Sequence, residues 1–124
     1  MKKSRELDIT KLKRIMKSLT NIDKVFRLNN INNPNDLKND EISQAAVTQF
    51  ITNIHEAKIK LRLITYNRLI NLNKIKLAGI RHISSHDYDN LEFNIIYYIC
   101  IKLIKAPILN EVRKVLEEIS KDGE

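Results

Sequence analysis

Residues 12–26 read LKRIMKSLTNIDKVF, and this stretch decides the fold class that we expect. Its apolar residues recur at alternating steps of three and four, the spacing of one face of an α-helix. The recurring residues are Leu12, Ile15, Leu19, Ile22 and Phe26. Lys13 and Lys17 fall on another face of the same helix. We therefore expect a helix over about residues 7–29, with Asp8 capping or leading it.

The middle of the chain predicts two more helices. Residues 29–39 are rich in asparagine, which is typical of turns, and Asp40 is expected to cap a second helix that reaches about residue 65. The apolar stripe of that helix is Ile42, Ala46, Phe50, Ile54, Ala57, Leu61 and Ile64. A third helix is expected over about residues 72–85, with Asn71 as its cap.

The C-terminal part predicts two further helices. A fourth carries Phe93, Ile96, Cys100 and Leu103, and a fifth begins at Pro107, a residue favoured in the first helical turn. The stripe of the fifth helix is Leu109, Val112, Leu116 and Ile119. With 2 Gly and 2 Pro, the chain has few residues that interrupt helices. We expect an all-α protein, an up-and-down four-helix bundle with a short fifth C-terminal helix.

Composition predicts one domain over residues 1–124. The single cysteine, Cys100, fits a reducing compartment. No secretory signal is apparent at the start, and the longest apolar run, residues 95–101, is too short to span a membrane. These features predict a cytoplasmic protein without a membrane partner.

Positive charge gathers in the first quarter of the chain. The formal net charge is +7, and residues 1–31 hold nine Lys and Arg against three acids. Such an excess is typical of a protein that binds a polyanion, but charge alone favours the other interpretation, a solvated helix face in a lysine-rich protein. A plain helical nucleic-acid binder that uses residues 2–27 therefore stays open.

The chemistry-bearing stretch is residues 79–88, GIRHISSHDY. Arg81 offers a planar fork of donors that matches phosphate oxygens, and His86 can gain or lose a proton near pH 7. Together they suffice for RNA cleavage by the neighbouring 2′-hydroxyl, with neither metal nor cofactor. Residues five apart on an ideal helix point about 140° from each other. Either His86 lies past a helix end, or a second copy of the chain completes the site.

The spacing Arg81-x4-His86-x-Tyr88 resembles the signature of HepT toxins in the HEPN superfamily. Residues 77–81, 54–57 and 44–47 resemble further segments of that family, and the likeness extends over about residues 8–120. It implies a single HEPN-type helical domain, a homodimer and a metal-independent endoribonuclease that acts on RNA. It also implies a minimal nucleotidyltransferase antitoxin as partner, which transfers AMP to the motif tyrosine, here Tyr88.

Two positions depart from the family pattern. The residue after the motif arginine is commonly asparagine, but here it is His82, which could share in proton transfer. The glycine of the family's Ile-Gly-Glu-Ala segment is replaced by His55, which affects the supporting role carried over to Glu56. Asp87 is another supporting candidate beside His86.

Two alternative interpretations remain. His82 and His86 have the spacing of two zinc ligands on one helix face, but a full ligand set is missing, so we expect no metal site. The chain could also be a non-catalytic module that binds a nucleotidyltransferase.

Overall fold

The computed structural model describes residues 4–77 and 90–121. Over these residues every regular element is helical, so the all-α prediction is confirmed. The elements are α1 (Arg5–Leu28), α2 (Pro34–Lys38), α3 (Glu41–Ile59), α4 (Leu63–Tyr66), the 3₁₀ turn η1 (Leu72–Lys74), α6 (Asn90–Leu103) and α7 (Ala106–Lys121).

Helix α1 carries the predicted apolar stripe. All five residues of the stripe, from Leu12 to Phe26, are buried in the core. The cap differs from the prediction, because the Ser4 side chain accepts a hydrogen bond from the Leu7 amide at 3.2 Å. Asp8 lies inside the helix and is itself buried. A short hydroxyl side chain one residue before the helix is a preferred cap, so the helix begins at Arg5.

The asparagine-rich connection contains a short helix, α2, that the sequence did not predict. Asn33 caps it by accepting from the Asp36 amide at 2.9 Å, and Pro34 is its first residue. Leu37 is fully buried and joins α2 to the core. Asn30 has a φ of 53°, a left-handed conformation that asparagine tolerates better than most residues. The residues that favour turns here also cap a single helical turn.

Helix α3 begins where it was expected, with the Asp40 side chain accepting from the Ser43 amide at 3.0 Å. Its buried face agrees with the predicted stripe in part, because Ile54 and Ala57 are buried as expected, and so is Leu61 just after the helix. Ile42 is 84% exposed and Ile64 is also exposed, while the helix buries Ser43, Val47, Thr48, Ile51, Ile54, Ala57 and Lys58. The helix ends at Ile59, before the predicted end near residue 65.

The third predicted helix is wrong over the part that the structure describes. Residues 72–74 form one 3₁₀ turn, and Ile75 after it has an extended backbone. Asn71 makes no side-chain cap. The Glu111 carboxylate of α7 instead accepts from the amides of Asn71 and Leu72, at 2.8 and 3.0 Å. A partner from a distant helix therefore takes the place of the predicted local cap.

The last helix is also different from the prediction. Helix α7 has 16 residues against 14 for α6, so it is not a short appendix. It begins at Ala106 with Pro107 in its first turn, and it buries Ile108, Val112, Val115 and Ile119.

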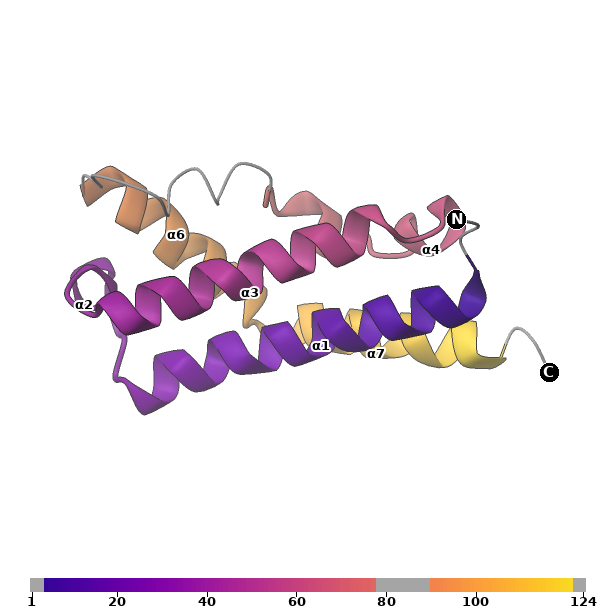
Figure 1. The fold of residues 1–124 in the computed structure, drawn as a ribbon, viewed down its shortest axis with the longest axis horizontal. Helices are drawn as coiled ribbons and strands as arrows, with labels where there is room; N and C mark the ends of the chain where they lie inside the picture. Colours follow the sequence, from indigo (N-terminus) through magenta and orange to yellow (C-terminus); the bar gives the residue numbers. More distant parts are fainter. Residues whose placement is uncertain (1–3, 78–89, 122–124) are drawn as a thin grey trace.

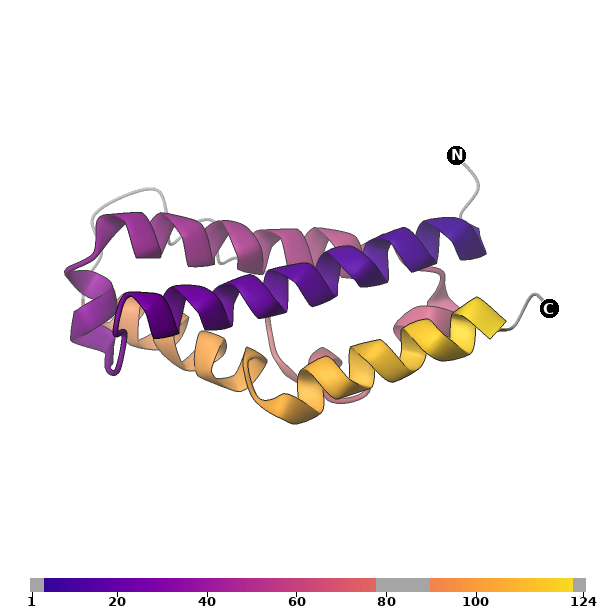
Figure 2. The same ribbon diagram turned by 90° about the horizontal axis from the view of Figure 1, so that it is seen from below.

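The long helices α1 and α3 lie side by side and run in opposite directions (Figure 1). Helices α6 and α7 follow one another along this pair, α6 against α2 and α3 and α7 against α1 (Figure 2). One continuous apolar core joins them. Helix α1 begins and α7 ends at the same end of the molecule, where α4 also lies. The four-helix bundle and the homodimer stay predictions.

Candidate functional site

Most of the predicted site lies outside the described residues. Arg81, His82, His86, Asp87 and Tyr88 all belong to this group. The expected arginine–histidine constellation therefore stays a prediction from the sequence.

The described chain has a buried apolar residue close to each side of residues 78–89. Leu77 is 3% exposed and packs in the core before it, and Phe93 of α6 is buried after it. Glu56, the supporting candidate, is half-buried in the last part of α3, as is His55. Leu77 and Phe93 thus belong to the packed part of the protein that the structure describes.

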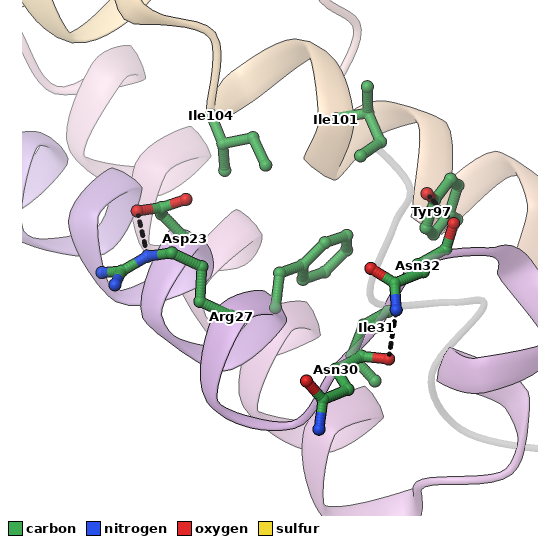
Figure 3. Close-up of a pocket in the computed structure, with 9 residues that line it drawn as sticks. Asp23, Arg27, Asn30, Ile31, Asn32, Tyr97, Ile101 and Ile104 are labelled. Carbon is green, nitrogen blue, oxygen red and sulfur yellow. Dashed lines mark hydrogen bonds and ion pairs between the residues drawn. The ribbon is translucent and has the colours of Figure 1, made fainter.

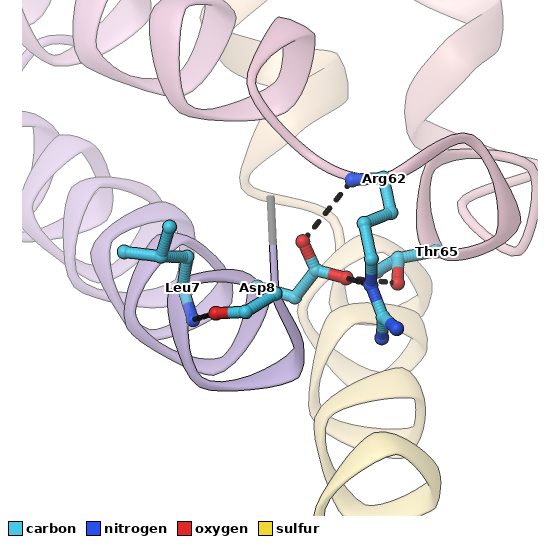
Figure 4. A network of polar contacts seen from close by, with 5 residues as sticks. Leu7, Asp8, Arg62 and Thr65 are labelled. Atoms are coloured by element: carbon cyan, nitrogen blue, oxygen red, sulfur yellow. Dashed lines mark hydrogen bonds and ion pairs between the residues drawn. The ribbon is translucent and has the colours of Figure 1, made fainter. Parts of the chain in front are cut away.

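A buried polar network ties the start of α1 to the connection after α3 (Figure 4). The Asp8 carboxylate accepts from the Arg62 amide at 3.1 Å and from the Arg62 guanidinium Nε at 2.6 Å. The Thr65 hydroxyl donates to the same carboxylate. Burial opposes ionisation of Asp8, but the hydrogen bonds from Thr65 and Arg62 outweigh it, so the pKa of Asp8 lies below its ordinary value. Asp8 is therefore a structural anion rather than an acid–base catalyst at neutral pH.

Lys58 is a second buried charged residue, after Asp8, that the sequence did not reveal. It is 6% exposed, and its ammonium lies 5.7 Å from the centroid of the Tyr66 ring. Burial lowers the pKa of Lys58. The lysine occupies the last turn of α3, where a cation is favoured by the helix dipole. Lys58 follows Ile54 by four residues and therefore lies on the same face of the helix. Because Ile54 was in the predicted apolar stripe, this spacing could have indicated from the sequence that Lys58 faces the core.

A groove of about 440 Å³ lies between the end of α1 and α6 (Figure 3). Phe26 and Tyr97 stack with ring centroids 5.6 Å apart, and the Tyr97 hydroxyl donates to the Asn32 carbonyl at 2.9 Å. Burial is the main cause that raises the pKa of Tyr97. Asp23 and Arg27 at the rim pair with each other at 3.0 Å. The Phe26–Tyr97 stack and the hydrogen bond from Tyr97 to Asn32 indicate a structural contact of α6 with the end of α1 and the connection after it.

Cys100 is fully buried in α6, and burial raises the pKa of its thiol to about 12. A thiol with this pKa stays protonated at neutral pH and is a poor nucleophile. Cys100 therefore serves the core, as expected of a cysteine in an apolar run.

Comparisons with known proteins gave no match: no family model, no curated protein and no solved structure is significantly similar to this chain. Within residues 4–77 and 90–121, no helix combines the length and apolar character that crossing a membrane requires. The candidate site rests on the chemistry and spacing of its own residues.

Proposed function

We propose that this chain is a HEPN-type, metal-independent endoribonuclease, the toxin of a toxin–antitoxin pair. The observation that carries the proposal is the spacing Arg81-x4-His86-x-Tyr88. It combines a permanent cation, a group that titrates near neutral pH and a phenol within eight residues. The net charge of +7 supports an RNA substrate, because a cationic protein attracts the phosphate backbone.

In the proposed reaction the 2′-oxygen of RNA attacks the adjacent phosphorus, and the bond from phosphorus to the 5′-oxygen breaks. His86 accepts the proton of the 2′-hydroxyl or donates a proton to the leaving 5′-oxygen, a role that typically contributes ~10²–10⁴-fold. Arg81 binds the phosphate oxygens and stabilises the charge that builds on them. His82, Asp87 and Glu56 support these two groups.

A homodimer would let the two copies of the motif face a shared cleft. This arrangement brings an arginine and a histidine to one phosphodiester although they are five residues apart in one chain. The antitoxin is a minimal nucleotidyltransferase that transfers AMP to Tyr88. The added bulk and negative charge would keep RNA from His86.

The test is RNA cleavage by purified protein in EDTA. His86→Ala and Arg81→Ala should each lower the cleavage rate by about a hundredfold or more. The matched control for Arg81→Ala is Arg113→Ala, because Arg113 is an exposed arginine of α7 outside the motif. Cleavage that is equal in wild type and His86→Ala would rule out the mechanism.

Growth on expression separates the enzyme from the alternative, a non-catalytic module that binds a nucleotidyltransferase. An active nuclease arrests growth, and His86→Ala restores it. Absence of arrest, together with tight binding to a nucleotidyltransferase encoded beside it, would favour the module.

A further inference from the structure

The segment around α4 combines exposed aliphatic side chains with an unusual charge pattern. Residues 57–77 contain six Lys and Arg and no Asp or Glu. The same segment exposes four large aliphatic side chains to solvent. These are Ile59 (53% exposed), Leu63 (71%), Ile64 (60%) and Ile70 (62%), which we name the α4 patch. Neither the proposed nuclease site nor the core uses them.

The Asp8 network determines which way α4 faces. Thr65 is fully buried because its hydroxyl donates to Asp8, and Leu69 one turn later is also fully buried. With Thr65 and Leu69 directed inward, the preceding Leu63 and Ile64 remain at the surface. A part-buried ionic contact thus accompanies two exposed aliphatic side chains of α4. Helix α4 lies at an end of the molecule (Figure 1).

The cations around the α4 patch differ in how far other elements neutralise them. Asp8 binds Arg62, and Glu118 of α7 lies 3.7 Å from Arg68. Glu111 accepts from the backbone amides of residues 71 and 72. Lys60, Lys74 and Lys76 are exposed and form no ion pair with any residue that the structure describes. The segment therefore keeps a positive field beside its apolar side chains.

We propose that the α4 patch and its lysines dock the protein onto an anionic lipid surface. Exposed aliphatic side chains enter the boundary between headgroups and acyl chains, while lysines bind anionic headgroups. This inference does not rest on the proposed nuclease. It departs from the sequence-based expectation of no membrane partner, which relied on the length of apolar runs and therefore on spanning segments alone.

Other occupants fit the chemistry less well. A second copy docked through the same face would bring two sets of lysines together, which costs free energy. Single-stranded RNA is bound in large part through stacking on aromatic side chains, whereas the exposed side chains of the patch are aliphatic. A protein partner also fits less well, because the cores of protein interfaces are depleted in lysine and leucine is uncommon among their strongest contacts.

The experiment measures flotation of the full chain with vesicles of phosphatidylcholine that contain about 30% phosphatidylserine, against vesicles of phosphatidylcholine alone. We expect binding to the anionic vesicles, with a weaker affinity at higher salt. Leu63→Ser combined with Ile64→Ser should lower that affinity about tenfold. The control is Ile42→Ser, because Ile42 is 84% exposed at the other end of α3. Equal binding to both kinds of vesicle, or an equal loss in the control, would overturn the proposal.

A charge series tests the second half of the proposal. Lys60→Gln combined with Lys74→Gln should lower the affinity for anionic vesicles about tenfold. Lys13→Gln combined with Lys17→Gln, on the exposed side of α1, should leave it within about twofold. The opposite ranking would place the contact on α1 and contradict the proposal.

A tryptophan reporter gives a readout that does not depend on affinity. The chain contains no tryptophan, so Leu63→Trp introduces a single probe. Its emission should shift to the blue when anionic vesicles are added, and that of Ile42→Trp should not. An unshifted Leu63→Trp would overturn the proposal. A second copy of the chain would be the occupant if the wild type were a dimer in solution and Leu63→Ser were a monomer. RNA would be the occupant if Leu63→Ser lost RNA binding but kept lipid binding. Either result would also overturn the proposal.

Discussion

Helix α1 and the segment from Lys60 to Leu77 differ in what determines their structure. In α1 a regular stripe of five buried apolar residues spans the helix, and its cap, Ser4, lies beside it in the sequence. In the segment 60–77 the elements are single turns, and their backbone amides bind Asp8 and Glu111, which lie 54 and 40 residues away. The first structure follows from local periodicity, whereas the second requires polar contacts between distant parts of the chain.

We expect the largest effect on stability from a substitution in the buried apolar stripe of α1. Ile15 is fully buried in α1, and Ile15→Ala should lower the free energy of unfolding by about 3 kcal/mol, through lost burial and the cavity left behind. Denaturant unfolding followed by circular dichroism measures it. The control is Leu28→Ala at the exposed end of the same helix, with an expected change within about 0.5 kcal/mol. Similar losses for both variants would mean that α1 is not buried as described.

The Asp8 network should be the next most sensitive point. Asp8→Asn keeps the size of the side chain but removes the charge that Arg62 and Thr65 contact, so we expect a loss of about 2 kcal/mol. The matched control is Asp23→Asn, which breaks the exposed pair with Arg27 on the same helix and should cost less than about 0.5 kcal/mol. Equal losses in the two variants would show that the segment 60–77 does not depend on this distant contact.

The pH dependence of stability provides an independent check on Asp8. Burial raises its pKa, but hydrogen bonds to Thr65 and Arg62 lower it further, so the folded value lies below the ordinary 3.8. The contribution to stability is therefore complete above the unfolded pKa and is lost as pH falls through the folded pKa. The stability difference between wild type and Asp8→Asn should be constant from pH 7 to about 5 and shrink below about pH 4. A constant difference down to pH 2 would contradict the assignment.

The sequence was sufficient to predict elements whose apolar residues recur at a regular helical spacing or whose cap is adjacent in the sequence. The spacing of α1 predicted its buried stripe, and an aspartate before an apolar run predicted the cap of α3. The buried face of α3 was predicted only in part, through Ile54 and Ala57, because it also carries Ser43, Thr48 and Lys58, and Ile42 is exposed. A face of mixed polarity weakens any inference from periodicity alone.

The remaining errors share one physical cause. The helix expected at residues 72–85 and the long second helix both assumed that local preference decides the backbone. Asp8 binds the Arg62 amide where the second helix would continue, and Glu111 binds the amides of residues 71 and 72 in place of the expected Asn71 cap; no local pattern shows such contacts. For the candidate site, the sequence supplied the residue types and spacing of Arg81, His86 and Tyr88, and their arrangement in space stays a prediction.

We expect the smallest effect from a substitution of Glu111. It tests whether the turn at residues 72–74 depends on this contact with a distant helix. Each carboxylate oxygen accepts from one backbone amide of residues 71 and 72, so Glu111→Gln removes the charge and one of the two acceptors. We expect a loss of about 1 kcal/mol in global stability. Hydrogen exchange at the amides of residues 71 and 72 should accelerate more than exchange in α1, because the contact that protects them is lost directly.

Glu117→Gln, on the exposed side of α7, is the matched control and should change neither quantity. If exchange accelerated equally in α1 and at residues 71 and 72, Glu111 would act on the whole protein, and the turn at η1 would not depend on this distant partner.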